Sequence, residues 1–184
     1  MDRDKLYTIG HSTRTLEDFL GLLARGGVTR LVDVRAFPAS RRYPHFNGPE
    51  LLQSLSAAGI TYSHSPDLGG RRKVRKDSRN TEWRNDGFRG YADYMETPRF
   101  ANALEELLET AIREPTVIMC AEAVPWRCHR SMIADAVVAR GVPVLHILDS
   151  ATQEHHMTSF AWVDNGRVRY DSATQNELFH PTSI

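Results

Sequence analysis

The sequence predicts an α/β protein: a single-domain, three-layer sandwich around a mostly parallel five-stranded sheet, with a small C-terminal hairpin. Short apolar runs alternate with segments of helical periodicity, which is typical of a parallel sheet covered by helices. The segment 116–120 is almost entirely apolar, as expected of a central strand. Asn165-Gly166 indicates a tight hairpin turn. The length of 184 residues fits one domain spanning residues 1–184.

The first half of the chain predicts three strands separated by two helices. Thr15 is a candidate N-cap for the first helix, whose apolar residues recur at helical spacing until Gly26-Gly27 ends it. Pro49 begins a shorter helix, which Gly59 ends. The expected strands are residues 6–10, 30–35 and 60–64.

The second half predicts two longer helices, two more strands and the hairpin. A helix is expected from about Tyr91, with its second part beginning at Thr97-Pro98. The next helix is bounded by Gly141, since glycine tolerates the conformation that ends a helix. These later elements are the strands 116–120 and 142–148, the helix 130–140 and the hairpin 161–170.

A basic insertion at about 67–90 interrupts the alternation and is expected to be a long surface loop. Between Arg71 and Arg89 it holds eight basic and three acidic residues, whereas the whole chain has 23 of each. Trp83 and Phe88 are aromatic residues of the kind that stack on unpaired bases. The segment is therefore either a solvated loop or an arm that binds nucleic acid through Arg71, Arg72, Lys73, Arg75 and Lys76.

Neither a membrane span nor an N-terminal signal region is visible in the sequence. We therefore expect a cytoplasmic protein with no membrane partner. The two cysteines do not form a disulfide framework, so they are expected to be free thiols, metal ligands or a redox pair.

Polar side chains follow four of the five predicted strands. The carboxyl ends of parallel strands meet at one edge of a sheet, where α/β proteins bind ligands. The sequence therefore predicts a cleft at this edge. The residues concerned are His11, Ser12, Asp33, Arg35, His64, Cys120 and Glu122.

Cys128 is followed by His129, Arg130 and Ser131 at the start of a predicted helix. Cationic neighbours and a helix N-terminus stabilise a thiolate. A strand, a loop and a helix beginning with arginine also form anion cradles. The catalytic candidates are His11, Glu122, Cys128 and His129. The candidates for binding an anionic substrate are Ser12, Asp33, Arg35, His64, Cys120, Arg130 and Ser131.

Zinc is a minority alternative at the same place. Cys120, Cys128 and His129, with His11 or His64, offer suitable ligand atoms, but the closely spaced Cys-x2-Cys pair of many zinc sites is absent. No cofactor or metal is therefore predicted. His155-His156 is expected to be an exposed polar pair.

In combination, several motifs resemble the DUF488 family over roughly residues 6–170. They are Thr8-Ile9-Gly10-His11-Ser12, Asp33-Val34-Arg35 with Pro38 and Ser40, Pro44 with Phe46, Leu68-Gly69-Gly70, and Cys120-Ala121-Glu122 with Cys128-His129-Arg130. The resemblance implies an α/β fold and a cytoplasmic protein. It implies no activity, because the family is named for lacking an assigned one.

Three hypotheses for the function follow. The first is an enzyme that acts on an anionic substrate, a nucleotide or a nucleic-acid fragment, in the strand-end cleft. The second is a non-catalytic module that binds nucleic acid or a protein through the basic insertion. The third is a thiol or sulfur-transfer protein that uses Cys120 and Cys128. The oligomeric state is left open.

Overall fold

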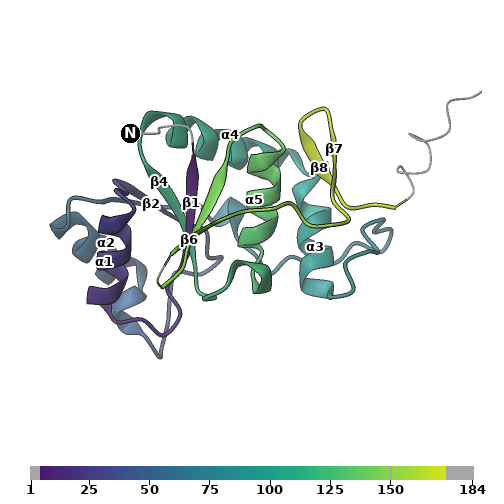
Figure 1. Cartoon of the computed structure of the whole chain (residues 1–184). Helices are drawn as coiled ribbons and strands as arrows, with labels where there is room; N and C mark the ends of the chain where they lie inside the picture. Colours follow the sequence, from purple (N-terminus) through teal and green to yellow (C-terminus); the bar gives the residue numbers. More distant parts are fainter. Residues whose placement is uncertain (1–4, 150, 173–184) are drawn as a thin grey trace, which may run out of the picture.

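The computed structural model describes residues 5–149 and 151–172, in which strands alternate with helices (Figure 1). The strands are β1 (Leu6–Gly10), β2 (Arg30–Asp33), β3 (Thr61–His64), β4 (Thr116–Cys120), β5 (Val144–Ile147), β6 (Thr152–Glu154), β7 (Trp162–Asp164) and β8 (Arg167–Arg169). The α-helices are α1 (Leu16–Arg25), α2 (Gly48–Ala57), α3 (Asp86–Met95), α4 (Pro98–Arg113) and α5 (Arg130–Val138). Three short 3-10 helices are η1 (Pro44–Phe46), η2 (Pro66–Leu68) and η3 (Pro125–Arg127).

The main sheet has the strand order β3-β2-β4-β1-β5-β6, and every pair except β5 with β6 is parallel. β4 thus lies between β2 and β1. The chain leaves β1 and β2 toward helices on one face, and leaves β4 toward α5 on the other. Neighbouring strands whose loops depart to opposite faces leave a crevice at their carboxyl ends. The topology therefore places a crevice at the end of β4, where Cys120 is the last residue.

Each face of the sheet has its own apolar core. One core combines α1 and α2 with Leu31, Val117 and Met119 of the sheet. The other combines α3, α4 and α5 with Ile118 and Cys120. In Figure 1, α1 and α2 accordingly lie to one side of the sheet and α5 to the other. Because side chains alternate along β4, Cys120 faces the layer that contains α5.

The structure confirms the predicted α/β class, the mostly parallel sheet and the C-terminal hairpin, which is β7 and β8. It adds one strand to the five predicted: β6 is an antiparallel edge strand. All three residues of β6 are exposed, so no apolar periodicity marked it. Among the residues that the structure describes, no helix has the length and apolar content that a bilayer span requires.

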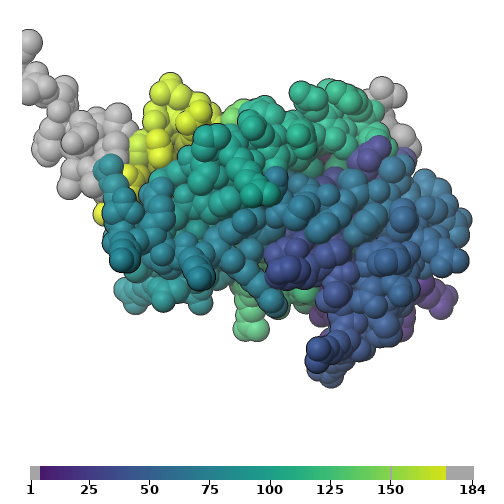
Figure 2. Space-filling view, turned by 180° about the vertical axis from the view of Figure 1, so that it is seen from behind, coloured from purple at the N-terminus to yellow at the C-terminus, as the bar shows by residue number. Residues whose placement is uncertain are grey.

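The basic insertion is held against α3 by a buried carboxylate. Asp93 accepts hydrogen bonds from the backbone N–H of Arg75 at 2.9 Å, the hydroxyl of Ser78 at 2.6 Å and the amide of Asn80 at 2.9 Å. A Cβ on Gly90 would lie 2.3 Å from the carbonyl oxygen of Arg72, so glycine permits this close packing. In the space-filling view, the teal surface of α3 and α4 adjoins the blue surface of the chain that leads to them (Figure 2).

A second buried carboxylate, Asp135 on α5, holds the segment after β6. It accepts hydrogen bonds from the hydroxyls of Thr158 and Tyr170, both at 2.7 Å, and from Nε2 of His155 at 2.8 Å. The expectation of an exposed His155-His156 pair was therefore wrong for His155, whose side chain is only 6% exposed. Periodicity did not reveal this because the partner lies twenty residues earlier in the chain.

Candidate functional site

A cleft of about 670 Å³ lies at the carboxyl ends of the parallel strands. This volume is within the range of small-molecule sites. We call it the strand-end cleft. It is bordered by the loops after β1, β2 and β4, by the segment after η2 and by the start of α3. Its lining residues are His11, Arg35, Ala36, Phe37, Ala39, Ser40, Gly70, Arg71, Asn85, Gly87, Phe88, Cys120, Ala121, Glu122, Arg127, Cys128 and His129.

The loop after β4 crosses over the end of β1, and Gly10 makes this crossing possible. A Cβ at Gly10 would lie 1.7 Å from the carbonyl oxygen of Glu122. The backbone N–H of His11 donates to the carbonyl of Cys120 at 2.9 Å, and that of Ser12 donates to Ala121 at 2.8 Å. The Gly10-His11-Ser12 motif thus fixes the end of β4 and the start of the loop that follows Cys120.

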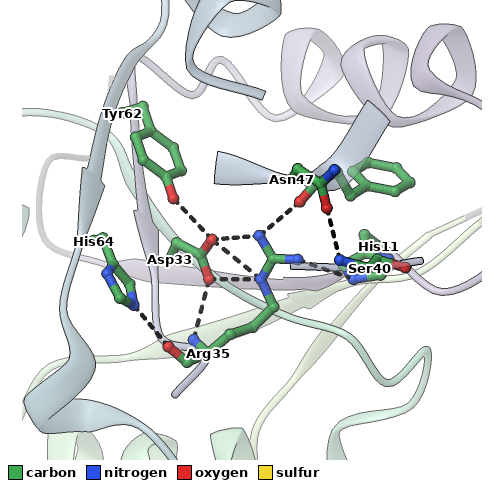
Figure 3. Close-up of polar contacts among 8 residues, drawn as sticks. His11, Asp33, Arg35, Ser40, Asn47, Tyr62 and His64 are labelled. Carbon is green, nitrogen blue, oxygen red and sulfur yellow. Dashed lines mark hydrogen bonds and ion pairs between the residues drawn. The ribbon is translucent and has the colours of Figure 1, made fainter. Parts of the chain in front are cut away.

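Asp33 and Arg35 form a buried ion pair beside the cleft (Figure 3). Arg35 donates to the carboxylate of Asp33 from Nε at 2.9 Å and from Nη2 at 2.6 Å. Tyr62 also donates to this carboxylate, at 3.0 Å, and burial, followed by the charge of Asp33, raises the pKa of its phenol. Nε2 of His64 donates to the carbonyl of Arg35 at 2.8 Å. The bonds to Asp33 occupy Nε and Nη2 of Arg35, so the charge of its guanidinium is largely compensated within the protein.

His11 lies at the edge of the cleft with its ring stacked on Phe46, at a centroid distance of 4.4 Å. Its Nδ1 donates to the carbonyl of Ser12 at 3.0 Å, which leaves Nε2 as the acceptor. Nη1 of Arg35 lies 3.5 Å from that Nε2. Burial, which outweighs the hydrogen bond to Ser12, lowers the pKa of His11. The imidazole is therefore neutral at pH 7.

Cys120, Cys128 and His129 form a compact cluster in the cleft. Their ligand atoms, two Sγ and one imidazole nitrogen, all lie within 4.8 Å of one another. Nδ1 of His129 is 3.6 Å from Sγ of Cys128, and its Nε2 donates to the carbonyl of Val34 at 3.1 Å. That donation identifies Nδ1 as the nitrogen that carries the lone pair. The structure thus brings together two cysteines that are eight positions apart in the chain.

The contact between the two thiols shifts their pKa values in opposite directions. A hydrogen bond from Cys128, together with the nearby His129 and Arg130, holds the pKa of Cys120 well below its usual range, although burial opposes this. The same pairing, with burial, raises the pKa of Cys128. The two sulfurs thus act on each other's titration, and the assignment of the thiolate to Cys128 stays a prediction.

Arg130 lies beneath the loop after β4 rather than in the cleft. It is only 1% exposed, and its Nη2 donates to the carbonyls of Glu122 and Ala123 at 3.1 and 3.4 Å. Nε and Nη1 of Arg130 are buried, with no hydrogen-bond partner among the described residues. Arg130 thus supports the loop and places a positive charge near the two sulfurs.

The strand-end cleft collects most of the predicted catalytic and binding residues. His11, Arg35, Glu122 and the cluster of Cys120, Cys128 and His129 all line it. The predicted residues outside its lining are Ser12, Asp33, His64, Arg130 and Ser131. The hydroxyl of Ser131 donates to the carbonyl of Cys128 at 3.0 Å, so it stabilises the first turn of α5.

Sequence reasoning missed several cleft residues, notably Phe37 and Asn85 in loops and Arg127 at the end of the short helix η3, where no periodicity marks them. The sequence also treated the five basic residues of the insertion as one binding arm, whereas the structure gives them different surroundings. Arg71 lines the cleft, but Arg72 packs over the ring of Tyr94 at 3.7 Å and Arg75 pairs with Glu96 at 2.7 Å. Lys73 and Lys76 are exposed.

Fold and site together define an α/β protein with a doubly covered sheet and a thiol–imidazole cluster in its strand-end cleft. The family model described as "Domain of unknown function DUF488" matches residues 15–137. The chain belongs to this family, which confirms the family assignment made from the sequence. No curated protein and no solved structure matches the chain.

Proposed function

We propose that this protein is an enzyme that binds an anionic substrate, a nucleotide or a nucleic-acid fragment, in the strand-end cleft. The observation that carries the proposal is the combination of two free guanidinium groups with a reactive thiol–imidazole cluster in one cleft. Arg71 and Arg127 supply the former, and Cys120, Cys128 and His129 the latter.

Arg71 and Arg127 are suited to hold the anion. Both are exposed and line the cleft, and neither guanidinium group has an ion-pair or hydrogen-bond partner within residues 5–149 and 151–172. Guanidinium groups bind phosphate and carboxylate in bidentate fashion. Arg35, in contrast, is compensated by Asp33. The free positive charge of the cleft is therefore concentrated at two positions.

Aromatic side chains at the cleft favour a nucleotide over a simple anion. Phe37 is 69% exposed and lines the cleft, and Phe88 lines it as well. Stacking of a base on an aromatic ring is worth about 1–3 kcal/mol. A bound nucleotide would place its phosphate between Arg71 and Arg127 and its base against Phe37.

The reacting groups lie within the same cleft. The cluster supplies two sulfurs and an imidazole lone pair, while His11 and the exposed carboxylate of Glu122 can exchange protons with a bound substrate. The proximity of Cys120 and Cys128 also favours thiol or sulfur-transfer chemistry as a second candidate. A purely nucleic-acid-binding arm has less support, because Arg72 and Arg75 contact groups of the protein itself.

The test measures binding and turnover separately. Nucleoside mono- and diphosphates and short oligonucleotides are titrated into the protein by calorimetry, and turnover is followed by phosphorus NMR. Arg71→Ala and Arg127→Ala should each weaken binding about ten- to a hundredfold, and the double variant more, because each hydrogen bond to a charged group contributes about 1.5–3 kcal/mol. Cys120→Ser should abolish turnover and leave binding in place.

The matched control is Arg167→Ala, which removes an exposed arginine from the hairpin and should leave affinity unchanged. If the double arginine variant binds as tightly as the wild type, the proposed anion site is wrong. If mass spectrometry found one extra sulfur atom on either cysteine, and no phosphate compound were turned over, the sulfur-transfer candidate would be favoured instead.

A further inference from the structure

We propose that Cys120, Cys128 and His129 form a zinc site with three protein ligands and a fourth position open to the strand-end cleft. The site itself is independent of which substrate binds there. Only its use in a reaction rests on the proposed function.

The spacing of the ligand atoms matches tetrahedral zinc. With Zn–S of about 2.3 Å and Zn–N of about 2.0–2.1 Å, a sulfur and a nitrogen ligand lie about 3.5 Å apart. Sγ of Cys128 and Nδ1 of His129 are 3.6 Å apart. All three ligand atoms lie within 4.8 Å of one another, so a modest contraction around a metal completes the set.

The imidazole is already oriented as a ligand. Nε2 of His129 donates to the carbonyl of Val34 at 3.1 Å, so the lone pair is on Nδ1, on the side of the sulfurs. Metal-binding histidines almost always make such an outer hydrogen bond, which fixes the tautomer and the ring. The ring of Tyr91 also packs against this imidazole, at a centroid distance of 5.0 Å.

Gly70 is part of this arrangement. A Cβ at this position would lie 2.8 Å from Nδ1 and 3.2 Å from two ring carbons of His129. Any side chain there would push the imidazole away from its position beside the sulfurs. The second glycine of the Leu68-Gly69-Gly70 motif is therefore needed to keep Nδ1 next to Cys128.

The surroundings also suit two thiolates. The backbone N–H of Arg130 donates to Sγ of Cys128 at 3.5 Å, and the buried guanidinium of Arg130 has Nε and Nη1 unpartnered among the described residues. Two thiolates, one neutral imidazole and Zn²⁺ have no net charge, and the positive Arg130 then favours an anionic fourth ligand. Three protein ligands with an open position are typical of catalytic rather than structural zinc.

In the proposed enzyme, zinc would hold a substrate phosphate oxygen or a water molecule next to Arg71 and Arg127. His11 and Glu122 line the same cleft, so proton-exchanging groups are at hand.

Metal binding is tested with the full-length, chelator-treated protein. Zn²⁺ is titrated against a chromophoric competitor, and Co²⁺ is added as a spectroscopic probe. We expect one equivalent to bind, with the intense visible bands of tetrahedral cobalt and a thiolate-to-cobalt charge-transfer band. Cys120→Ser and Cys128→Ser should each weaken zinc binding more than a hundredfold and reduce the charge-transfer band.

Two further variants separate a metal site from loss of folding. Gly70→Ala retains every ligand but should weaken binding at least tenfold, while His156→Ala removes an exposed histidine and should bind zinc like the wild type. Near-ultraviolet circular dichroism confirms that each variant is folded. The proposal is overturned if the folded wild-type protein has no higher affinity for zinc than folded Cys128→Ser. It is also overturned if cobalt binds without a charge-transfer band.

The outcome is distinguishable from failure of the proposed function. Arg71→Ala with Arg127→Ala should leave zinc binding unchanged, since neither arginine belongs to the ligand set. Zinc binding without nucleotide binding would retain the metal site and reject the substrate class. Nucleotide binding by a protein that binds no zinc would retain the substrate class and reject the metal site.

Discussion

At Asp33 and Arg35 the chain buries a charge pair between the sheet and the cleft. Asp33 is fully buried and Arg35 is 5% exposed, so each charge is shielded from water and needs the other as its counter-charge. Their place at the end of β2 was predictable from the sequence. Their partners were not, because Tyr62, His64 and the carbonyl of Phe46 come from other elements.

Removing one partner of this pair should be costly. We expect Asp33→Ala to lower the free energy of unfolding by about 3–5 kcal/mol, because it leaves Arg35 buried without a counter-charge. Urea denaturation followed by circular dichroism measures this. The double variant Asp33→Leu with Arg35→Met should be less destabilised than Asp33→Ala. A loss below about 1 kcal/mol in Asp33→Ala would contradict the prediction.

The reactive residues show what a sequence can reveal about a site. The chain order predicted that Cys120 and Glu122 lie at a strand end near His11, and all three line the cleft. It did not predict the direct contact between Cys128 and His129 or the proximity of their atoms to Cys120. Their proximity to Cys120 depends on the path of the loop between Cys120 and Cys128, which no periodic pattern encodes.

Among the secondary-structure elements, the loop after β4 depends most on another element, because it crosses the end of β1 at Gly10. We expect Gly10→Ala to destabilise the protein by about 1–3 kcal/mol or more, since its Cβ would collide with the carbonyl of Glu122. Thermal unfolding checks this, and the displaced loop should also alter the reactivity of Cys120 toward a thiol reagent.

The matched substitution is Gly21→Ala within α1. There the added Cβ would meet only Nη1 of Arg25, at 3.7 Å. Alanine favours a helix interior over glycine by about 0.8–1.0 kcal/mol, so this variant should be more stable than the wild type. If both variants had the same stability, the close approach at Gly10 would not be a real constraint.

Elements with a strong apolar pattern were predictable, and those without one were not. β4 and the helix after Thr97-Pro98 lie where the sequence placed them. α3 begins at Asp86, inside the stretch expected to be a loop, because Asn85 caps it through Gly87 and Phe88. The basic insertion looked unstructured because its anchor, Asp93, is a single acidic residue on the following helix.

On the scale of the whole molecule, a buried chain of hydrogen bonds joins β1, β5 and α5. Thr8 lies 2.7 Å from Nδ1 of His146, Nε2 of His146 lies 3.0 Å from Nδ1 of His155, and Nε2 of His155 lies 2.8 Å from Asp135. One set of neutral tautomers satisfies all three bonds, with each group donating toward Asp135. Burial, then the nearby His155 and Arg130, lowers the pKa of His146 to about 3.

The buried hydrogen-bonded series from Thr8 to Asp135 should make the stability of the fold sensitive to acid. Unfolded His146 binds a proton below about pH 6.5, whereas folded His146 resists it until about pH 3, so stability is greatest above pH 6.5 and falls between these values. His146 alone should cost about 2 kcal/mol of unfolding free energy between pH 7 and pH 5. Urea denaturation at a series of pH values measures the slope.

The comparison variant for this slope is His146→Gln, which cannot take up a proton and should show a flatter pH profile. His156→Ala, at an exposed position, should keep the wild-type profile. An unchanged slope in His146→Gln would assign the acid sensitivity to other groups.

The order of strands in the sheet decides where a fragment of this chain can be cut. The family model covers residues 15–137, yet β1 and β5 lie outside it, and β1 is hydrogen-bonded to β4 on one side and β5 on the other. A fragment cut at the limits of the match would lack Gly10 and His11 and would expose the edge of β4 next to Cys120. An expressed fragment of this chain should therefore begin before β1 and extend past β5, so that β4 and β1 keep their neighbours in the sheet.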